Sequence, residues 1–371
     1  MVIACLVAVA VAALAATFVP SAVALEKGLI DCRLEGSTNM ETRAAIIAEI
    51  GPTLGAHWVR LLVHWDGIEP QRGKYAKARL VSLRTLVDQL RAQGIKVILT
   101  VYRVPQWAQE QYWWEHPPPS VPRGPQPFYP IRDDRLGDFA RFGRMLATYF
   151  AGRVEALECW NEPNTFQYIY PQRTRKDPYF AAEKYLYMLS WFHAGVFNSR
   201  TGMPVIAGAT TSYGANDRYT TSPQRFAGHL AARGAGGLCE AISHHPYTPG
   251  ASAETAPDRR PDIPERTVTF YNLGELLELF PDKPFYLTEF GYNTDASVHF
   301  GYSFVSYATQ ADYLKRAYAC AAGYPQVKVL IWYLLWDAKT AGASASTGVY
   351  TGLRTIAGEK KPSWYAFQAL P

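Results

Sequence analysis

The stretch from 78 to 101, ARLVSLRTLVDQLRAQGIKVILTV, combines one helix pattern with one strand pattern. Its first part places apolar residues three and four positions apart, which predicts an amphipathic helix, and Gly94 is a typical stop after such a helix. Its second part, KVILTV at 96–101, is a nearly continuous apolar run. Runs of this kind are typical of parallel strands that are buried on both faces.

The same alternation recurs along the whole chain. The runs that predict strands span 28–33, 57–63, 96–101, 153–160, 203–209, 238–244, 283–289 and 327–335. The patterns that predict helices span 42–54, 78–94, 135–150, 181–200, 225–234, 267–280, 308–323 and 362–370. Eight strand–helix units in succession are typical of one closed barrel of parallel strands. We therefore expect an α/β protein, a single (β/α)8 TIM barrel over residues 25–371.

The composition limits the classes of ligand. Hydrophobic residues make up 48% of the chain and charged residues 19%, which is an ordinary globular balance. The net charge is only +5 without a long Lys or Arg run, so we expect no nucleic-acid partner. Aromatic residues reach 14%. Such an excess is typical of rings that stack on sugars, although bulky core packing also uses it.

The first 24 residues resemble a targeting segment. They carry no charge and end in Ala22-Val23-Ala24, which has the small-x-small form of a signal-peptidase site. We expect a secretory signal peptide over 1–24 and a secreted monomer without stable membrane insertion after cleavage. No basic residue precedes the apolar run, so an uncleaved N-terminal anchor that holds the protein outside is the alternative.

Four cysteines remain after such a cleavage, namely Cys32, Cys159, Cys239 and Cys320. They could form two disulfides in an oxidising compartment. Cys159 and Cys239, however, lie in or beside apolar strand runs, where a lone cysteine is usually a small buried hydrophobe. The spacing assigns no pairs.

Two long connections follow predicted strands, at 102–132 and 165–178. In a barrel, such loops lie at the carboxyl ends of the strands, where barrel enzymes build their sites. The first loop contains Tyr112, Trp113 and Trp114. These rings either stack on sugar faces or pack against the barrel.

Two glutamates occupy matching positions on distant strands. Glu162, in ECWNEPN (158–164), follows the fourth predicted strand, and Glu289, in FYLTEFGYN (285–293), ends the seventh. In a barrel both side chains point into the mouth at the carboxyl-terminal face. Cleavage of a glycosidic bond needs such a pair, because one carboxyl protonates the leaving oxygen and the other stabilises or attacks the anomeric carbon.

These motifs resemble those of glycoside hydrolase clan A, a superfamily of retaining enzymes on (β/α)8 barrels. Asn-Glu-Pro at Glu162 is similar to its acid/base motif, and Thr-Glu-Phe-Gly at Glu289 to its nucleophile motif. Arg60 in WVRLLVHW resembles the second-strand arginine of family 5. His245 and Tyr247 in SHHPYT resemble the His-x-Tyr pair after the sixth strand. Further segments are similar to families 5 and 39.

The resemblance implies an O-glycosyl hydrolase and a role for each matched residue. Glu289 would be ionised and attack the anomeric carbon, held by Arg60 and Tyr247. Glu162 would start protonated, with its pKa raised by the negative charge of Glu289, and would later accept a proton from water. Asn161 would bind the 2-hydroxyl of the sugar.

Two strands depart from the pattern of these families. The eighth strand of the families carries a tryptophan under the sugar, a few residues before an acidic one. Here Trp332, Tyr333 and Trp336 all precede Asp337, and Trp336 is slightly favoured because it lies nearest the strand end. The third strand ends in Tyr102 instead of the histidine of family 5.

Other functions are open to the same residues. A non-catalytic carbohydrate-binding barrel would keep the aromatic rings but has no need for both glutamates. A metal-dependent hydrolase would use His244, His245 and Glu289, but adjacent residues of a strand point to opposite faces. We therefore expect a carbohydrate substrate, no cofactor and no metal, with His245 binding substrate or buffering the site.

Overall fold

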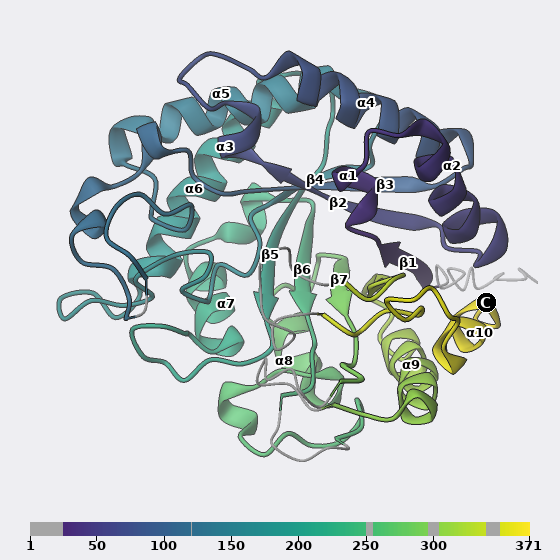
Figure 1. Cartoon of the computed structure of the whole chain (residues 1–371). Coiled ribbons are helices and arrows are strands. Elements are labelled where there is room, and N and C mark those ends of the chain that lie inside the picture. The colour runs from purple at the N-terminus through teal and green to yellow at the C-terminus, as the bar shows by residue number, and fades with distance from the viewer. Residues whose placement is uncertain (1–24, 120, 250–254, 296–303, 339–348) are drawn as a thin grey trace, which may run out of the picture.

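The computed structural model describes residues 25–119, 121–249, 255–295, 304–338 and 349–371. Eight parallel strands close into a barrel in sequence order, and β8 pairs with β1 (Figure 1). The strands are β1 Glu26–Ile30, β2 Trp58–His64, β3 Lys96–Tyr102, β4 Ala156–Cys159, β5 Val205–Thr211, β6 Ala241–His245, β7 Phe285–Phe290 and β8 Val327–Tyr333. Each overlaps its predicted run, so the predicted (β/α)8 barrel is confirmed.

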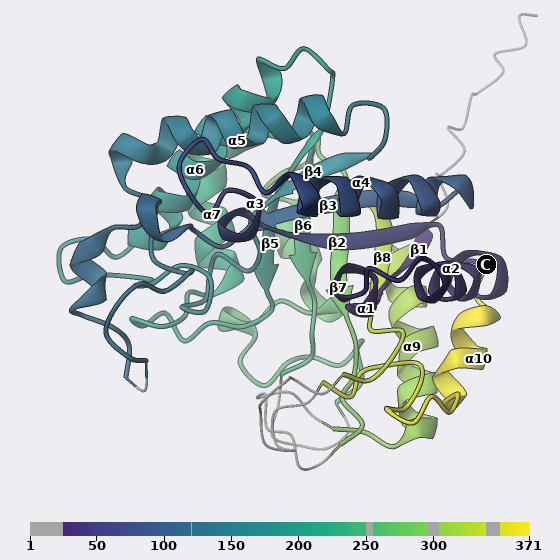
Figure 2. The ribbon, with the colours of Figure 1, turned by 45° about the horizontal axis from the view of Figure 1, so that its top comes forward.

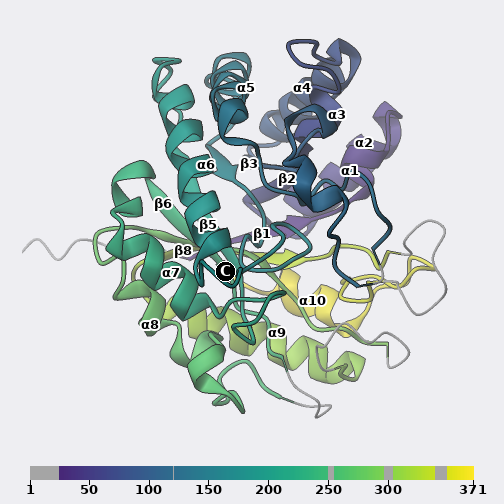
Figure 3. The same cartoon turned by 90° about the vertical axis from the view of Figure 1, so that its left-hand side faces the viewer.

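Helices surround the barrel (Figures 2 and 3). The α-helices are α1 Arg33–Gly36, α2 Met40–Ala48, α3 Trp65–Ile68, α4 Lys77–Ala92, α5 Leu136–Tyr149, α6 Phe180–Phe197, α7 Pro223–Ala232, α8 Gly274–Leu277, α9 Tyr307–Ala322 and α10 Pro362–Gln368. Shorter turns are η1 Glu49–Thr53, η2 Gln106–Ala108, η3 Gln111–Trp114, η4 Asp133–Arg135, η5 Ala235–Leu238, η6 Pro264–Arg266 and η7 Phe270–Asn272.

The predicted helix over 267–280 is wrong in extent. Only the turn η7 and the single-turn helix α8 form there. The side chain of Asn272 accepts from the backbone N–H of Thr269 and donates to the carbonyl of Thr267. These local bonds satisfy backbone groups outside a helix, which competes with helix formation.

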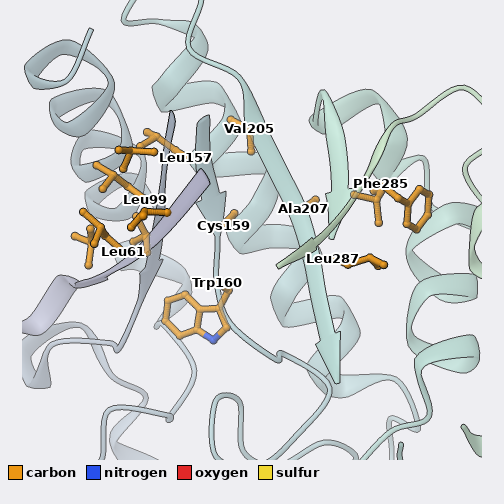
Figure 4. Close-up of a cluster of buried hydrophobic side chains, with 14 of the residues drawn as sticks. Leu61, Leu99, Leu157, Cys159, Trp160, Val205, Ala207, Phe285 and Leu287 are labelled. Carbon is orange, nitrogen blue, oxygen red and sulfur yellow. The ribbon is translucent and has the colours of Figure 1, made fainter. Parts of the chain in front are cut away.

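The two faces of the strands build two different cores. Residues that point outward pack against the helices, as the cluster around Leu61, Leu99 and Leu157 shows (Figure 4). Residues that point inward fill one end of the barrel with apolar side chains, namely Trp58, Ile98, Ala156, Ile206, Ala241, Val329 and Ile331. Two positions further along three of these strands, the inward residues are Arg60, Thr100 and Glu158, all fully buried. The barrel interior therefore changes from apolar to charged toward the carboxyl ends.

All four cysteines of residues 25–371 are free thiols, so the two possible disulfides do not form. Cys159 lies in the outer hydrophobic core, as a small apolar residue. Within the described ranges, we find no helix that is both long and apolar enough to cross a membrane. The predicted signal peptide over 1–24 lies outside the described residues.

Candidate active site

The end of β4 turns two polar side chains into the barrel mouth. Cys159 and Trp160 both lie in the outer hydrophobic cluster (Figure 4), which breaks the alternation of the strand. Trp160 has a φ of 76°, in the left-handed region that non-glycine residues rarely adopt. Its indole N–H donates to the carbonyl of Tyr168 over 3.0 Å, which anchors the ring. Asn161 and Glu162 follow this reversal and face inward.

Arg60 is the centre of the polar interior. Its guanidinium donates to Glu158 Oε2 over 2.7 Å, to Asn161 Oδ1 over 2.7 Å and to Glu289 Oε1 over 2.5 Å. Burial would lower the pKa of Arg60, but the carboxylates of Glu158 and Glu289 raise it above its ordinary value. One fully buried cation from β2 therefore links the ends of β4 and β7.

Glu289 is held on both oxygens. Oε1 accepts from Arg60, and Oε2 accepts from the hydroxyl of Tyr247 over 3.0 Å. The residue retains only 9% of its exposed area. These two hydrogen bonds fix the orientation of the carboxylate.

Glu162 has a different environment. Its Oε1 lies 3.0 Å from Nδ1 of His245, and 16% of its side chain is exposed. Burial raises the pKa of Glu162 to about 7, against the opposing effects of Arg60 and a hydrogen bond from Thr211. The sequence predicted a raised pKa but the wrong cause, because burial and not the charge of Glu289 is the largest contribution.

The two glutamates face each other across the mouth. A carboxylate oxygen of Glu162, a carboxylate oxygen of Glu289 and a ring nitrogen of His245 all lie within 4.8 Å of one another. The structure thus brings Arg60, Asn161, Glu162, His245, Tyr247 and Glu289 into one site, as the sequence predicted.

The adjacent histidines point to opposite faces of β6. His244 contacts Thr210 Oγ1 at 2.9 Å and the carbonyl of Val268 at 3.1 Å, both outside the site. A metal centre that needs both His244 and His245 is therefore excluded by geometry. His245 with the two glutamates is close enough to surround a cation, but Arg60 already places a positive charge on Glu289.

The predicted aromatic contacts of β8 need correction. Trp332 is fully buried in the outer core, where it packs edge-on against Phe290 and donates to the carbonyl of Thr351. It therefore cannot contact a sugar. One face of Trp336 is covered by the guanidinium of Arg33, with Cζ 3.9 Å from the ring centroid. That face is not free to stack on a sugar either.

Tyr333 is the aromatic side chain of β8 that faces the mouth. It is half-buried and packs with the inner apolar cluster, and burial together with the charge of Glu289 raises its pKa. Val329 and Ile331 precede it on the same inner face. Counting in twos along the strand from these residues would have identified Tyr333 from the sequence.

Two further tyrosines near the pair were missed as site residues. Burial raises the pKa of Tyr168, and the charges of Glu162 and Glu289 raise it further. Tyr102 ends β3, and its hydroxyl lies 2.8 Å from Nε2 of His64. The two tyrosine rings have centroids 5.9 Å apart. Tyr102 is in phase with the inward residues of β3, whereas Tyr168 lies in a loop and gave no signal.

Cavities extend from these rings. A cavity of about 710 Å³ is lined by residues that include Cys32, Glu35, His64 and Tyr102. A second, of about 200 Å³, is lined by residues that include Tyr102 and Tyr168. Tyr102 lines both cavities, whereas neither Glu162 nor Glu289 lines either of them.

The aromatic rings of the first long loop divide between packing and exposure. Trp113 is buried against Tyr170 and Phe180, with ring centroids 5.9 and 5.8 Å away. Trp114 is half-buried. Only Tyr112 of the three is largely exposed, at 63%. The tryptophans therefore mainly hold the loop, as one of the two sequence interpretations expected.

No protein-family model and no curated protein sequence matches the chain. Solved structures do match. A family 39 glycoside hydrolase from Bacteroides cellulosilyticus is 20% identical, with a TM-score of 0.60 over 94% of this chain and 63% of that one. GH5_18 from Streptomyces cattleya, in complex with Manb1-4GlcNAc, is 17% identical, with a TM-score of 0.67 over 93% and 79%. An exo-beta-1,4-mannosidase from an Opitutaceae bacterium is 14% identical, with a TM-score of 0.62 over 93% and 58%. The chain thus has the barrel fold of these glycoside hydrolases.

Proposed function

We propose that the protein is a secreted retaining glycoside hydrolase that cleaves β-linked O-glycosidic bonds by double displacement. The observation that carries the proposal is the pair Glu162 and Glu289, whose nearest carboxylate oxygens lie within 4.8 Å and whose hydrogen-bond partners differ. One carboxyl is bound by a cation and a hydroxyl, and the other has a raised pKa. Titratable pairs whose environments differ in this way are typical of acid and nucleophile assignments.

In the first step, Glu289 attacks the anomeric carbon while Glu162 gives its proton to the glycosidic oxygen. The bond to the leaving group breaks, and an ester bond forms between the sugar and Glu289. Arg60 and Tyr247 hold the attacking carboxylate in place. Asn161, which is itself fixed by Arg60, would bind the sugar's 2-hydroxyl.

In the second step, Glu162 is an anion and takes a proton from water. The oxygen of that water attacks the anomeric carbon, and the ester bond to Glu289 breaks. The sugar leaves with its original anomeric configuration, Glu289 is again a carboxylate and Glu162 is again protonated. Two inversions at one carbon give this net retention.

The short distance between the glutamates supports retention over inversion. Retaining enzymes hold their two carboxyl groups about 5–5.5 Å apart, whereas inverting pairs stand at about 6.5–9.5 Å to admit a water molecule. One carboxylate oxygen of Glu162 and one of Glu289 lie within 4.8 Å, which is compatible with the shorter spacing. The aromatic side chains of Tyr102, Tyr168 and Tyr333 around the pair support a carbohydrate as the substrate.

The test is a screen of aryl β-glycosides and β-linked oligosaccharides with three proteins. Wild type should hydrolyse at least one substrate. Glu289→Gln should bind that substrate without turnover, because the amide cannot form the ester. Glu115→Gln, at a site whose side chain is 66% exposed, is the matched control and should retain activity. Binding by both wild type and Glu289→Gln, with no turnover by either on any substrate, would indicate a carbohydrate-binding barrel instead.

A further inference from the structure

A third carboxylate lies beneath the glutamate pair. Glu158 is fully buried on the inner face of β4 and is paired with Arg60 at 2.7 Å. Its Oε2 also accepts from the hydroxyl of Thr100 over 2.6 Å. Burial would raise the pKa of Glu158, but Arg60 and these hydrogen bonds outweigh it and lower the pKa. Glu158 is therefore an ionised carboxylate, which can only accept hydrogen bonds.

Thr288 connects this carboxylate to His245. The Thr288 hydroxyl donates its single proton to Glu158 Oε1 over 2.9 Å. Its oxygen lies 3.1 Å from Nε2 of His245. Because the hydroxyl proton is already used, Thr288 can only accept at this contact. Nε2 of His245 must therefore carry a hydrogen.

The opposite nitrogen of His245 faces the pair. Burial lowers the pKa of His245 to about 4, so the ring is neutral at neutral pH and carries one hydrogen. With that hydrogen on Nε2, Nδ1 has only a lone pair, 3.0 Å from Glu162 Oε1 and 3.7 Å from Glu289 Oε2. A carboxylate anion and a lone pair repel each other at this distance. The contact is favourable only if Glu162 supplies a proton.

We propose that Thr288 and Glu158 are positioning residues which fix the tautomer of His245 and thereby hold Glu162 in its acid form. The inference deepens the proposed glycosidase function and rests on it for its catalytic meaning. No proton moves along the chain. The proton of Glu162 rests against Nδ1 in the empty site and passes to the glycosidic oxygen when substrate is bound. The Glu162 anion then faces the Nδ1 lone pair, which makes it a stronger base toward water in the second step.

Other groups also face Glu162 and set the background of its titration. Arg60 lowers its pKa, as does the hydrogen bond from Thr211, and Glu289 and Tyr168 are further titratable groups near it. The hydrogen-bond partner of His245 Nε2 is the hydroxyl of Thr288, at 3.1 Å. A change confined to Thr288 therefore isolates the tautomer from the remaining electrostatics.

The experiment compares Thr288→Val, Thr288→Ser and Thr100→Val in the full-length protein. Thr100 is the matched control, because it is equally buried and also donates to Glu158. The readout is the titration of the Glu162 carboxyl, followed by carbon NMR with labelled glutamate and assigned by the loss of its signal in Glu162→Gln. It needs no substrate, so it remains valid if the proposed glycosidase activity is absent.

Thr288→Val should lower the midpoint of Glu162 by about one pH unit, because His245 can then place its proton on Nδ1 and stabilise the anion. Thr288→Ser should restore the wild-type midpoint, and Thr100→Val should leave it nearly unchanged. Equal midpoints in Thr288→Val and wild type would overturn the proposal. So would equal shifts in the valine and serine variants. If Thr288→Val does not fold, nitrogen NMR of wild-type His245 decides, since a proton on Nδ1 contradicts the proposal and one on Nε2 supports it.

Discussion

At the scale of single residues, the site depends on how burial and neighbouring charges give two glutamate carboxyls different properties. Glu162 and Glu289 differ in their partners, which are a neutral histidine for one and a buried arginine and a tyrosine for the other. Sequence motifs placed both residues correctly. The motifs did not reveal the roles of Glu158 and Thr288. Those roles depend on contacts with residues of other strands, which only the folded barrel brings together.

The raised pKa of Glu162 predicts a pH limit on activity. Its folded-state pKa of about 7 lies above the ordinary 4.5, so the acid form is present below about pH 7 and is lost as the pH rises through that value. The value of kcat/KM should therefore fall above about pH 7. A pH–rate profile of wild type checks this, and a profile that is flat from pH 6 to 9 would contradict the acid role.

Replacement of Glu162 should have an effect that depends on the leaving group. Glu162→Ala should cost about 10²–10⁴-fold on substrates with poor leaving groups, which is the usual size of acid catalysis. Aryl glycosides whose phenolate leaves unaided should lose far less in the first step. The measurement is kcat/KM for a series of aryl glycosides whose phenol leaving groups differ in pKa. Equal losses across that series would remove the acid assignment while leaving Glu289 untouched.

Replacement of the two adjacent aromatic residues of β8, Trp332 and Tyr333, should affect different properties of the protein. Trp332→Ala should lower the free energy of unfolding by about 3–5 kcal/mol, because its ring is fully buried in the outer core. Tyr333→Ala should instead weaken substrate use by about threefold to tenfold, the size of one aromatic contact of about 0.5–1.5 kcal/mol. Denaturant unfolding and steady-state kinetics separate the two effects. Unimpaired kinetics in Tyr333→Ala would show that Tyr333 does not contact substrate.

At the scale of elements, close packing between helices sets the frame of the barrel. Gly195 on α6 lies against α5 so tightly that an added Cβ would meet the backbone of Ala140. Gly195→Ala should therefore destabilise the protein by about 1–3 kcal/mol or more, as overpacking does. Gly228 on α7 has open space around it. Gly228→Ala is the matched control and should stabilise by about 0.5–1 kcal/mol. Thermal unfolding of both variants checks the contrast, and equal effects would contradict the packing argument.

Helices and strands were predictable from the sequence where the apolar residues followed one clear spacing. The strands are buried on both faces and were visible as apolar runs, and the long helices showed apolar residues three and four apart. The exceptions have local causes. Asn272 bonds to nearby backbone and stops the helix predicted over 267–280. At the end of β4, the left-handed Trp160 breaks the two-residue period, so the outward ring of Trp160 and the inward orientation of Asn161 do not follow from counting.

At the scale of the whole molecule, the closed barrel explains why residues from β2, β4, β6 and β7 meet. The carboxyl ends of all strands lie on one rim, so motifs separated by long stretches of sequence converge there. The repeated strand–helix pattern was enough to predict that these motifs lie together at one end of a barrel. The depth of each side chain in the mouth was not, since it depends on bulges such as the one between Gly208 and Thr210.

The expected signal peptide leads to a prediction about export of the whole molecule. We predict that the protein is secreted and that the mature form begins near Leu25, after the Ala22-Val23-Ala24 site. N-terminal sequencing of material from the culture medium checks this. Material that stays with the membrane fraction and retains residue 1 would support an N-terminal anchor instead.

The central claim is that Glu289 forms a covalent ester with the sugar, and the anomeric configuration of the first product tests it most directly. Proton NMR during wild-type hydrolysis of a β-glycoside, recorded before mutarotation, should show the β-anomer first. Glu289→Ala with added azide should give the α-glycosyl azide, because the azide attacks from the face that the missing carboxylate vacates. An α-anomer as the first product of the wild-type enzyme would contradict the double displacement and the role of Glu289.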